Sequence, residues 1–218
     1  MIRPLTLALA AFAVVVTTAP ASSAAPPRPT AVQAAPLAPA DQALVGRAAA
    51  YLDGLTTARA RFTQTDARGA VSQGELYLKR PGKMRFDYDQ PASQLIVSDG
   101  GGVILYDRRL KTYERYPLAS TPLSLFLARH VSLSDGVVVT RVAHMPNGFA
   151  ISVRDARRQA QGEVTLTFSD NPLALQEWSI LDGQGARTNV RLSNLRPVGA
   201  IDPSLFVVRD PRVPEGPR

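Results

Sequence analysis

Few side chains in this sequence have the type and spacing that catalysis or metal binding requires. The chain contains no cysteine, which excludes cysteine nucleophiles, thiolate metal sites and disulfides. Its two histidines, His130 and His144, have no further ligand at the spacing of a metal site. The motifs of serine hydrolases, zinc proteases and phosphate-binding loops are also missing. We therefore predict a protein that is not an enzyme and has no cofactor and no metal site.

Two aspartates, Asp87 and Asp89, come closest to a catalytic pair of carboxylates. They would share one face of an extended strand, because alternate side chains of a strand point the same way. Lys83 and Arg85 precede them in the same run. We therefore expect both carboxylates to bind neighbouring Arg or Lys side chains. The glycines at 100–102 lack the strand-to-helix context of a nucleotide loop and predict a hairpin turn.

Arg80 occupies a position where an apolar residue would be expected. Leu76 and Leu78 point to one face of the expected strand, and Arg80 is the next residue on that face. After a proline–glycine turn, Met84 and Phe86 continue an apolar face in the following strand. An arginine thus ends an apolar row that faces the interior.

A buried guanidinium needs acceptors for its five N–H donors. We expect main-chain carbonyls at a helix end or in a lid to accept hydrogen bonds from Arg80. The alternative is that Arg80 pairs with a surface carboxylate such as Asp87 or Asp89.

The elements that must position these residues are mostly strands. A helix is expected from Asp41, as its N-cap, to near Gly54. Short runs with alternating apolar residues then follow, separated by Gly, Pro and Asp turns. These runs are residues 58–66, 74–80, 83–89, 93–99, 102–109, 111–117, 137–145, 148–155, 162–170, 174–182 and 186–195. They predict a mainly β fold with helices, built as an antiparallel barrel or strongly curved sheet.

One segment, "STPLSLFLARH" (120–130), interrupts the strands. Thr121 is expected as the N-cap of a short helix, with Pro122 at its first position. One face of this helix would carry Leu123, Phe126, Leu127 and His130. Such a helix could cover the sheet and enclose a hydrophobic ligand. The simpler interpretation is that the inward apolar rows are only core. Near the end, "DPSLF" (202–206) predicts another capped turn.

The first 24 residues have the layout of a secretory signal peptide. Arg3 precedes an apolar run from Leu5 to Val16, and small residues follow up to Ala24, where we expect cleavage. The run is too short for a convincing membrane span, which makes a retained anchor the weaker alternative. Residues 25–40, rich in proline and alanine, are expected to form a linker, and 41–218 a single domain.

Charge and composition restrict the partners. The formal net charge is +7, but the basic residues are scattered and lack the interleaved aromatic residues of a nucleic-acid platform. Export without cysteine fits a bacterial periplasm. Because no cysteine is available for lipidation, we expect the mature protein to be soluble rather than lipid-anchored.

Three motifs in order resemble the periplasmic outer-membrane lipoprotein carriers of the LolA family. They are "LYLKRPGKMRFDYDQP" (76–91), "IVSDGGGVILYD" (96–107) and "TPLSLFLARH" (121–130). The likeness extends from the helix at Asp41 to "DPSLFVV" (202–208) and covers essentially the whole domain. The resemblance implies an incomplete β-barrel with a helical lid over a hydrophobic cavity that takes acyl chains.

The resemblance also implies roles for single residues. Arg80 falls on the arginine of the family's K-R-P motif and would lock the lid by binding its main-chain carbonyls in the closed, empty state. Met84 takes the hydrophobic position after the proline, near the cavity mouth, and Phe86 the following aromatic position. With these, the residues expected to line the cavity are Leu76, Leu78, Met84, Phe86, Leu123, Phe126 and Leu127.

The implied function is transport of lipoproteins across the periplasm of a Gram-negative bacterium. The implied partners are lipoprotein acyl chains, an inner-membrane lipoprotein-releasing ABC transporter, and an outer-membrane acceptor or the outer membrane itself. We expect a monomer that binds no nucleic acid.

Three other functions are alternatives to the carrier. A periplasmic lipid or lipoprotein sensor on the same fold would need a signalling domain or tether, for which we see no room after Leu195. An outer-membrane acceptor would need a lipidated cysteine. An enzyme acting on envelope lipids would need a catalytic set.

Overall fold

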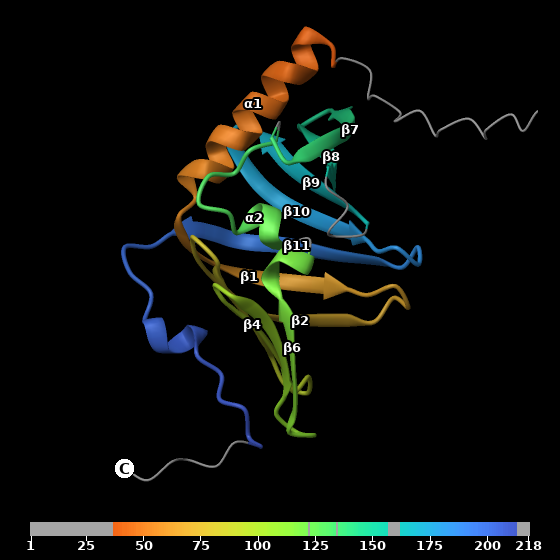
Figure 1. The fold of residues 1–218 in the computed structure, drawn as a ribbon. Helices are drawn as coiled ribbons and strands as arrows, with labels where there is room; N and C mark the ends of the chain where they lie inside the picture. The colour runs from red at the N-terminus through yellow and green to blue at the C-terminus, as the bar shows by residue number, and fades with distance from the viewer. Residues whose placement is uncertain (1–36, 122, 134, 157–161, 213–218) are drawn as a thin grey trace, which may run out of the picture. The chain divides into compact units, whose positions relative to one another are not determined.

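The computed structural model describes residues 37–121, 123–133, 135–156 and 162–212. Within these ranges the chain forms one long helix, eleven strands and three short helical turns (Figure 1). In chain order they are α1 (Pro39–Gly54), β1 (Thr57–Thr65), β2 (Val71–Lys79), β3 (Lys83–Tyr88), β4 (Gln94–Asp99), β5 (Gly102–Asp107), β6 (Thr112–Pro117), η1 (Leu118–Ser120), α2 (Leu123–Phe126), β7 (Val137–Met145), β8 (Gly148–Asp155), β9 (Glu163–Asp170), β10 (Leu173–Leu181), β11 (Arg187–Pro197) and η2 (Pro203–Phe206). Every strand-like run of the sequence forms a strand.

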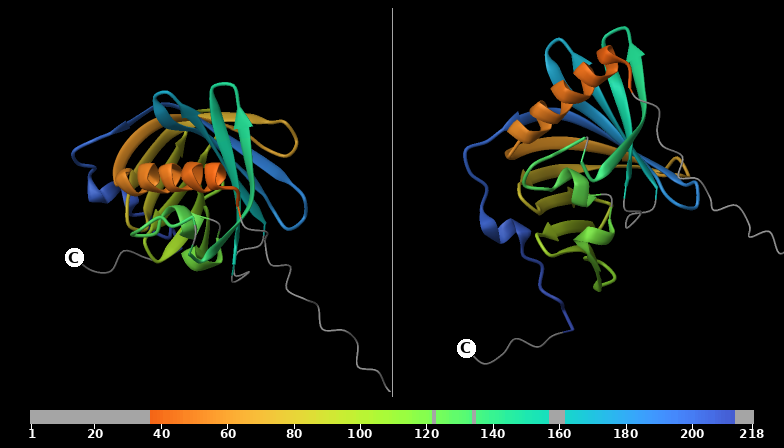
Figure 2. Two further views of the ribbon diagram at one scale, coloured as in Figure 1. Left: turned by 90° about the horizontal axis from the view of Figure 1, so that it is seen from above. Right: turned by 45° about the horizontal axis from the view of Figure 1, so that its top comes forward.

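The strands of these ranges form one antiparallel sheet in the order β6-β5-β4-β3-β2-β1-β11-β10-β9-β8-β7. Because β1 pairs with β11, the first and last strands meet in the middle of the sheet, and β6 and β7 are its free edges. The sheet curves strongly, and α1 and α2 lie on its concave side (Figure 2). This arrangement confirms the predicted incomplete, curved β-barrel.

The main core lies between the concave face of the sheet and the helices. Alternate residues of each strand point into it, as the period of two requires. Phe62 of β1 packs edge-to-face against Phe86 and Tyr88 of β3, with ring centroids 5.1 and 5.0 Å apart. Val45 and Leu52 bring one side of α1 into the same core.

A smaller core lies on the outer face, where the C-terminal segment covers β4. Ile201 and Phe206 pack there against Leu95 and Val97. The side chain of Asp202 accepts a hydrogen bond from the Ser204 amide at 2.9 Å, which confirms the predicted capped turn.

The start of α1 differs from the sequence prediction. α1 begins at Pro39, so Asp41 lies in its first turn and is not the N-cap. The predicted first position of α2, Pro122, lies outside the described residues, and the hydroxyl of Thr121 before it donates to the Leu118 carbonyl at 2.9 Å.

The helix predicted up to His130 is also shorter than expected, because α2 ends at Phe126. The next carbonyls, of Leu127 and Ala128, bind Gly82 and Arg80 and not later helical amides. His130 is therefore exposed beyond the helix.

In the described part of the chain, no helix is both long and apolar enough to cross a membrane.

Candidate functional site

Arg80 follows β2 directly, and its guanidinium lies against the C-terminal end of α1. Its Nε donates to the Leu55 carbonyl at 3.0 Å, and its Nη2 donates to the carbonyls of Asp53, at 3.0 Å, and Leu52. The last carbonyls of a helix lack intrahelical donors and carry partial negative charge. Arg80 therefore supplies donors to a helix end that the fold leaves partly buried.

The same turn also holds the segment that follows α2. We call residues 123–133 the α2 segment. Arg80 Nη1 donates to the Ala128 carbonyl at 3.5 Å, and the Gly82 amide donates to the Leu127 carbonyl at 2.8 Å. Gly82 has a φ of 78°, and a Cβ there would lie 2.7 Å from the Cα of Gly100. Only glycine fits a positive φ at such close approach.

The environment of Arg80 differs from that of a surface arginine. Burial lowers the pKa of its guanidinium, while the nearby negative charge of Asp53 acts in the opposite direction. From the sequence alone, pairing of Arg80 with a surface carboxylate is an alternative. In the described residues, however, all the hydrogen bonds found for its guanidinium go to main-chain carbonyls. The expectation of carbonyl acceptors thus agrees with the geometry.

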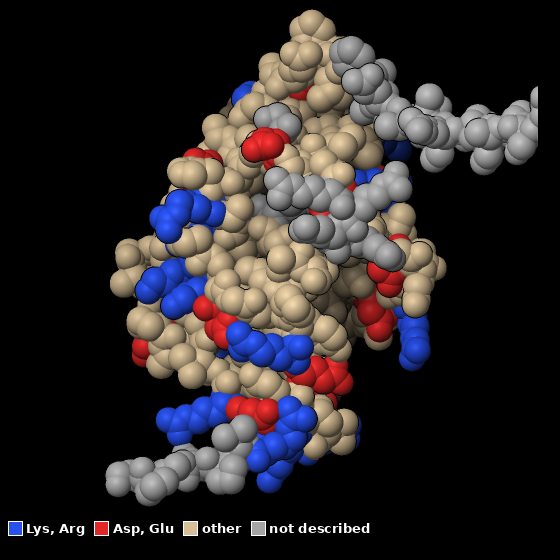
Figure 3. Space-filling model, in the orientation of Figure 1, with Lys and Arg blue, Asp and Glu red and all other residues tan. Residues whose placement is uncertain are grey.

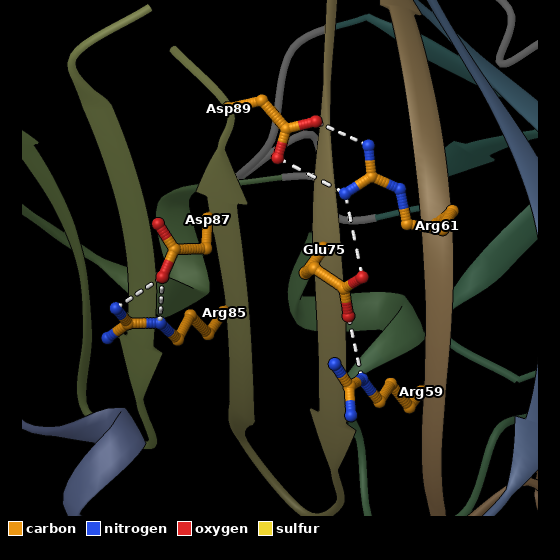
Figure 4. A network of polar contacts seen from close by, with 6 residues as sticks. All are labelled: Arg59, Arg61, Glu75, Arg85, Asp87 and Asp89. Carbon is orange, nitrogen blue, oxygen red and sulfur yellow. Dashed lines mark hydrogen bonds and ion pairs between the residues drawn. The ribbon is translucent and has the colours of Figure 1, made fainter.

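Asp87 and Asp89 are engaged elsewhere, on the outer face of the sheet (Figure 4). Asp87 binds Arg85 at 2.6 Å and Arg108 at 2.5 Å, and Asp89 binds Arg61. Burial by itself raises the pKa of Asp87, but the hydrogen bonds from both arginines outweigh it and hold that pKa below its usual range. The prediction that these aspartates bind neighbouring cations is confirmed, and the alternative that they pair with Arg80 is wrong.

A small apolar pocket lies beneath α2, on the concave side of the sheet. Its open space is about 20 Å³, and it is lined by Leu123, Phe126, Val164, Leu166, Trp178 and Ile180. The ring of Phe126 lies 5.9 Å from that of Trp178, which in turn lies 6.0 Å from Phe86. The pocket is thus nearly filled by its own side chains.

The sequence-predicted cavity residues divide into two groups. Leu123 and Phe126 line the pocket directly. The others are buried in the adjoining core: Leu76, Leu78, Met84, Phe86 and Leu127. Sequence reasoning missed the opposite wall, which β9 and β10 provide through Val164, Leu166, Trp178 and Ile180. The alternating apolar residues of "EVTLTFSD" and "ALQEWSIL" were the available signal.

A larger apolar groove of about 620 Å³ lies between α1 and the start of β7. Val45 and Ala49 of α1 form one wall, and Val137 and Val139 form another. Val131, Ser132 and Leu133 of the α2 segment complete it. The α2 segment therefore borders both apolar spaces. Figure 3 shows mostly uncharged atoms in the middle of this face and charged side chains gathered toward its lower end.

No cluster of three His, Asp or Glu side chains that could hold a metal ion occurs in the described ranges. The sequence pattern of the family "Outer membrane lipoprotein carrier protein LolA" matches residues 53–209. This chain belongs to the LolA family. The match includes the turn at Arg80, the α2 segment and both walls of the pocket.

Curated relatives of this LolA-family chain agree with the match. The outer-membrane lipoprotein carrier protein of Methylococcus capsulatus is 34% identical over 175 residues, covering 76% of this chain and 83% of that protein. The carrier of Azotobacter vinelandii is 29% identical over 191 residues, covering 82% and 88%. A crystal structure of a LolA superfamily protein from Nitrosomonas europaea has a TM-score of 0.45 at 9% identity, covering 76% and 98%.

Membership in the LolA family confirms the predicted function of an outer-membrane lipoprotein carrier. It also confirms a transport protein in place of an enzyme. LolA carriers are periplasmic and bind lipoprotein cargo, which sets the frame for the roles of single residues.

Proposed function

We propose that this carrier shields the acyl chains of a lipoprotein on the concave face of its sheet, beneath a lid formed by the α2 segment. The observation that carries this proposal is the position of that segment between two apolar spaces. Leu123 and Phe126 face the pocket, whereas Val131 and Leu133 face the groove. Outward movement of the segment would join the two spaces into one cavity.

The small volume of the pocket supports the proposal that the lid moves when cargo binds. The pocket under α2 has room for about one water molecule, since its open space is about 20 Å³. The groove alone, at about 620 Å³, falls within the range of about 300–1,000 Å³ typical of ligand sites. A lipoprotein anchor with more than one acyl chain therefore requires displacement of Phe126 from Trp178.

Arg80 would hold the lid closed while the carrier is empty. Its hydrogen bond to Ala128, at 3.5 Å, would break as cargo enters and reform as cargo leaves, while its bonds to the end of α1 hold the guanidinium next to the lid. A charge-assisted hydrogen bond of normal length contributes about 1.5–3 kcal/mol, and one as long as 3.5 Å contributes less. Reforming it would offset part of the hydrophobic free energy lost when acyl chains depart, which favours release.

The rest of the cycle follows from the location of the family. Residues 1–24 would direct export and be removed after Ala24, and the following linker would join the mature N-terminus to the domain. The carrier would act as a monomer in the periplasm of a Gram-negative bacterium. It would receive cargo from an inner-membrane lipoprotein-releasing ABC transporter and deliver it to an outer-membrane acceptor or to the membrane itself.

The test is isolation of the carrier from a periplasm that also contains one defined lipoprotein. The matched control is the same cargo with its lipidated cysteine replaced by serine. Native mass spectrometry should show a complex with the acylated cargo and none with the unacylated one. Equal binding of both cargoes, or binding of free phospholipid alone, would contradict the proposal.

A further inference from the structure

Asp53, at the end of α1, contacts both Arg80 and the α2 segment. Its main-chain oxygen accepts a hydrogen bond from Arg80 Nη2 at 3.0 Å. Its carboxylate oxygen Oδ1 accepts one from the main-chain amide of Val131 at 3.2 Å and lies 3.6 Å from His130 Nδ1. One residue at the end of α1 therefore reaches the turn after β2 and the α2 segment together.

The chemistry of this contact requires an acceptor that Arg80 cannot provide. A guanidinium only donates hydrogen bonds, so Arg80 can hold the Ala128 carbonyl but not an amide. The side chain of Val131 is buried against the core. Its amide needs an acceptor at that place, and the carboxylate of Asp53 supplies a charged one, which strengthens the hydrogen bond.

We propose that Asp53 is a positioning residue that fastens the far end of the lid, so that the lid is clamped at two points. This inference rests on the proposed function, in which the α2 segment opens. Gly82 and Arg80 hold the segment at Leu127 and Ala128, and Asp53 holds it at Val131. Opening then requires both clamps to break.

Asp53 also supports the first clamp from a distance. Burial lowers the pKa of Arg80, and the charge of Asp53 opposes this effect. The carboxylate thus adds a favourable electrostatic interaction to a guanidinium that stays charged at neutral pH. Loss of the carboxylate should therefore remove the clamp at Val131, whereas loss of Arg80 should weaken the clamp at Leu127 and Ala128.

The same helix offers a matched control. Asp41 is the other acidic residue of α1, and its carboxylate lies 2.8 Å from His144 Nε2 on β7. Asp41 and Asp53, both on α1, therefore each lie beside a histidine from another part of the chain. Of these two aspartates, Asp53 has a hydrogen bond to the described part of the α2 segment, whereas the bond found for Asp41 goes to β7. Asp41→Ala therefore removes a comparable aspartate–histidine contact without removing a bond to the lid.

Hydrogen exchange of the cargo-free protein tests the inference without any lipoprotein. In Asp53→Ala the Val131 amide should exchange about tenfold faster or more, while amides of the central strand β1 keep their wild-type rates. Asp53→Asn, which keeps an acceptor but loses the charge, should give a smaller acceleration. Asp41→Ala should leave the Val131 amide at the wild-type rate.

Wild-type exchange at Val131 in Asp53→Ala, or equal acceleration throughout the sheet, would overturn the two-point clamp. If Asp53→Ala does not fold, Asp53→Asn carries the test, and a wild-type rate in it overturns the inference. A failure of the carrier proposal is distinguishable, because it would appear as absence of lipoprotein binding by the wild-type protein whatever the exchange rates are.

Discussion

The guanidinium of Arg80 donates from Nη2 to the main-chain oxygen of Asp53 at 3.0 Å, which joins the residue after β2 to the end of α1. Each of the two residues also binds the α2 segment, Arg80 through Ala128 and Asp53 through Val131. The end of α1, the turn after β2 and the α2 segment are thus connected through a single pair of residues. Entry of acyl chains beneath the α2 segment, as proposed, requires this connection to open.

Arg80→Leu should produce a carrier that holds cargo too well. Leucine suits the apolar row of Leu76 and Leu78, so folding should survive. Removing the charged hydrogen bond to Ala128 raises the population of the open form, and apparent affinity should rise by up to about tenfold. The measurement is the rate of transfer of one labelled lipoprotein to outer-membrane vesicles.

The control for this variant is Arg59→Leu, since Arg59 pairs with Glu75 on the outer face. Its transfer rate should match that of the wild type. Release from Arg80→Leu at the wild-type rate would show that Arg80 does not lock the lid.

Phe126→Ala and Phe62→Ala should lower the free energy of unfolding by different amounts, which distinguishes a lid residue from a core residue. Phe62 is fully buried among Phe86 and Tyr88, and its truncation should lower the free energy of unfolding by about 3–5 kcal/mol. Phe126 is only partly buried over Trp178, so its loss should cost less than about 2 kcal/mol. Urea unfolding provides both values. Equal costs would mean that α2 is part of the permanent core.

Met84→Glu should destabilise the folded domain as a whole and not only its binding of cargo. The sequence places Met84 near the cavity mouth, but in the closed form it is only 1% exposed. A carboxylate buried there without a partner should cost about 3–5 kcal/mol. Met84→Leu, which conserves volume, should cost less than about 1.5 kcal/mol. If urea unfolding finds Met84→Glu as stable as Met84→Leu, water must reach this position in the native state.

The strands could be predicted from the sequence because their signals are local. Alternation of period two and the turn residues between runs depend only on neighbours along the chain. The helix ends could not be predicted equally well. α2 ends at Phe126, and the carbonyls of Leu127 and Ala128 that follow it accept hydrogen bonds from Gly82 and Arg80, which are far away in the sequence. The path of the chain after α2 therefore depends on contacts that the local sequence does not contain.

For the candidate site, the sequence predicted the role of Arg80 but not the groups that lie across from it. The position of Arg80 in an apolar row indicates that it needs carbonyl acceptors. The sequence does not show which carbonyls come near, because the curvature of the sheet decides what lies across from each strand. Trp178 and Asp53 were missed for that reason, since each acquires its role from contacts between distant elements.

Stability at alkaline pH should report the burial of Tyr88. Burial raises the pKa of its hydroxyl to about 12. The unfolded chain loses this proton near pH 10, so the contribution is constant below pH 10 and stability falls as pH rises toward 12. The loss is about 2–3 kcal/mol for a shift of this size. Urea unfolding at pH 9 and 11.5 should show a steeper loss in the wild type than in Tyr88→Phe. The same loss in both proteins would exclude this cause.

Fluorescence quenching of Trp178 tests most directly whether acyl chains enter beneath the α2 segment. Trp178 is the single tryptophan of the chain, is 6% exposed, and lines the pocket beside Phe126. The cargo-free protein would be titrated with a lipopeptide that carries brominated acyl chains, and with its unbrominated counterpart as control. Calorimetry would measure binding of each independently. We expect saturable binding of both, with strong quenching by the brominated lipopeptide alone. Saturable binding of the brominated lipopeptide without quenching of Trp178 would contradict the account, because the acyl chains would then lie elsewhere.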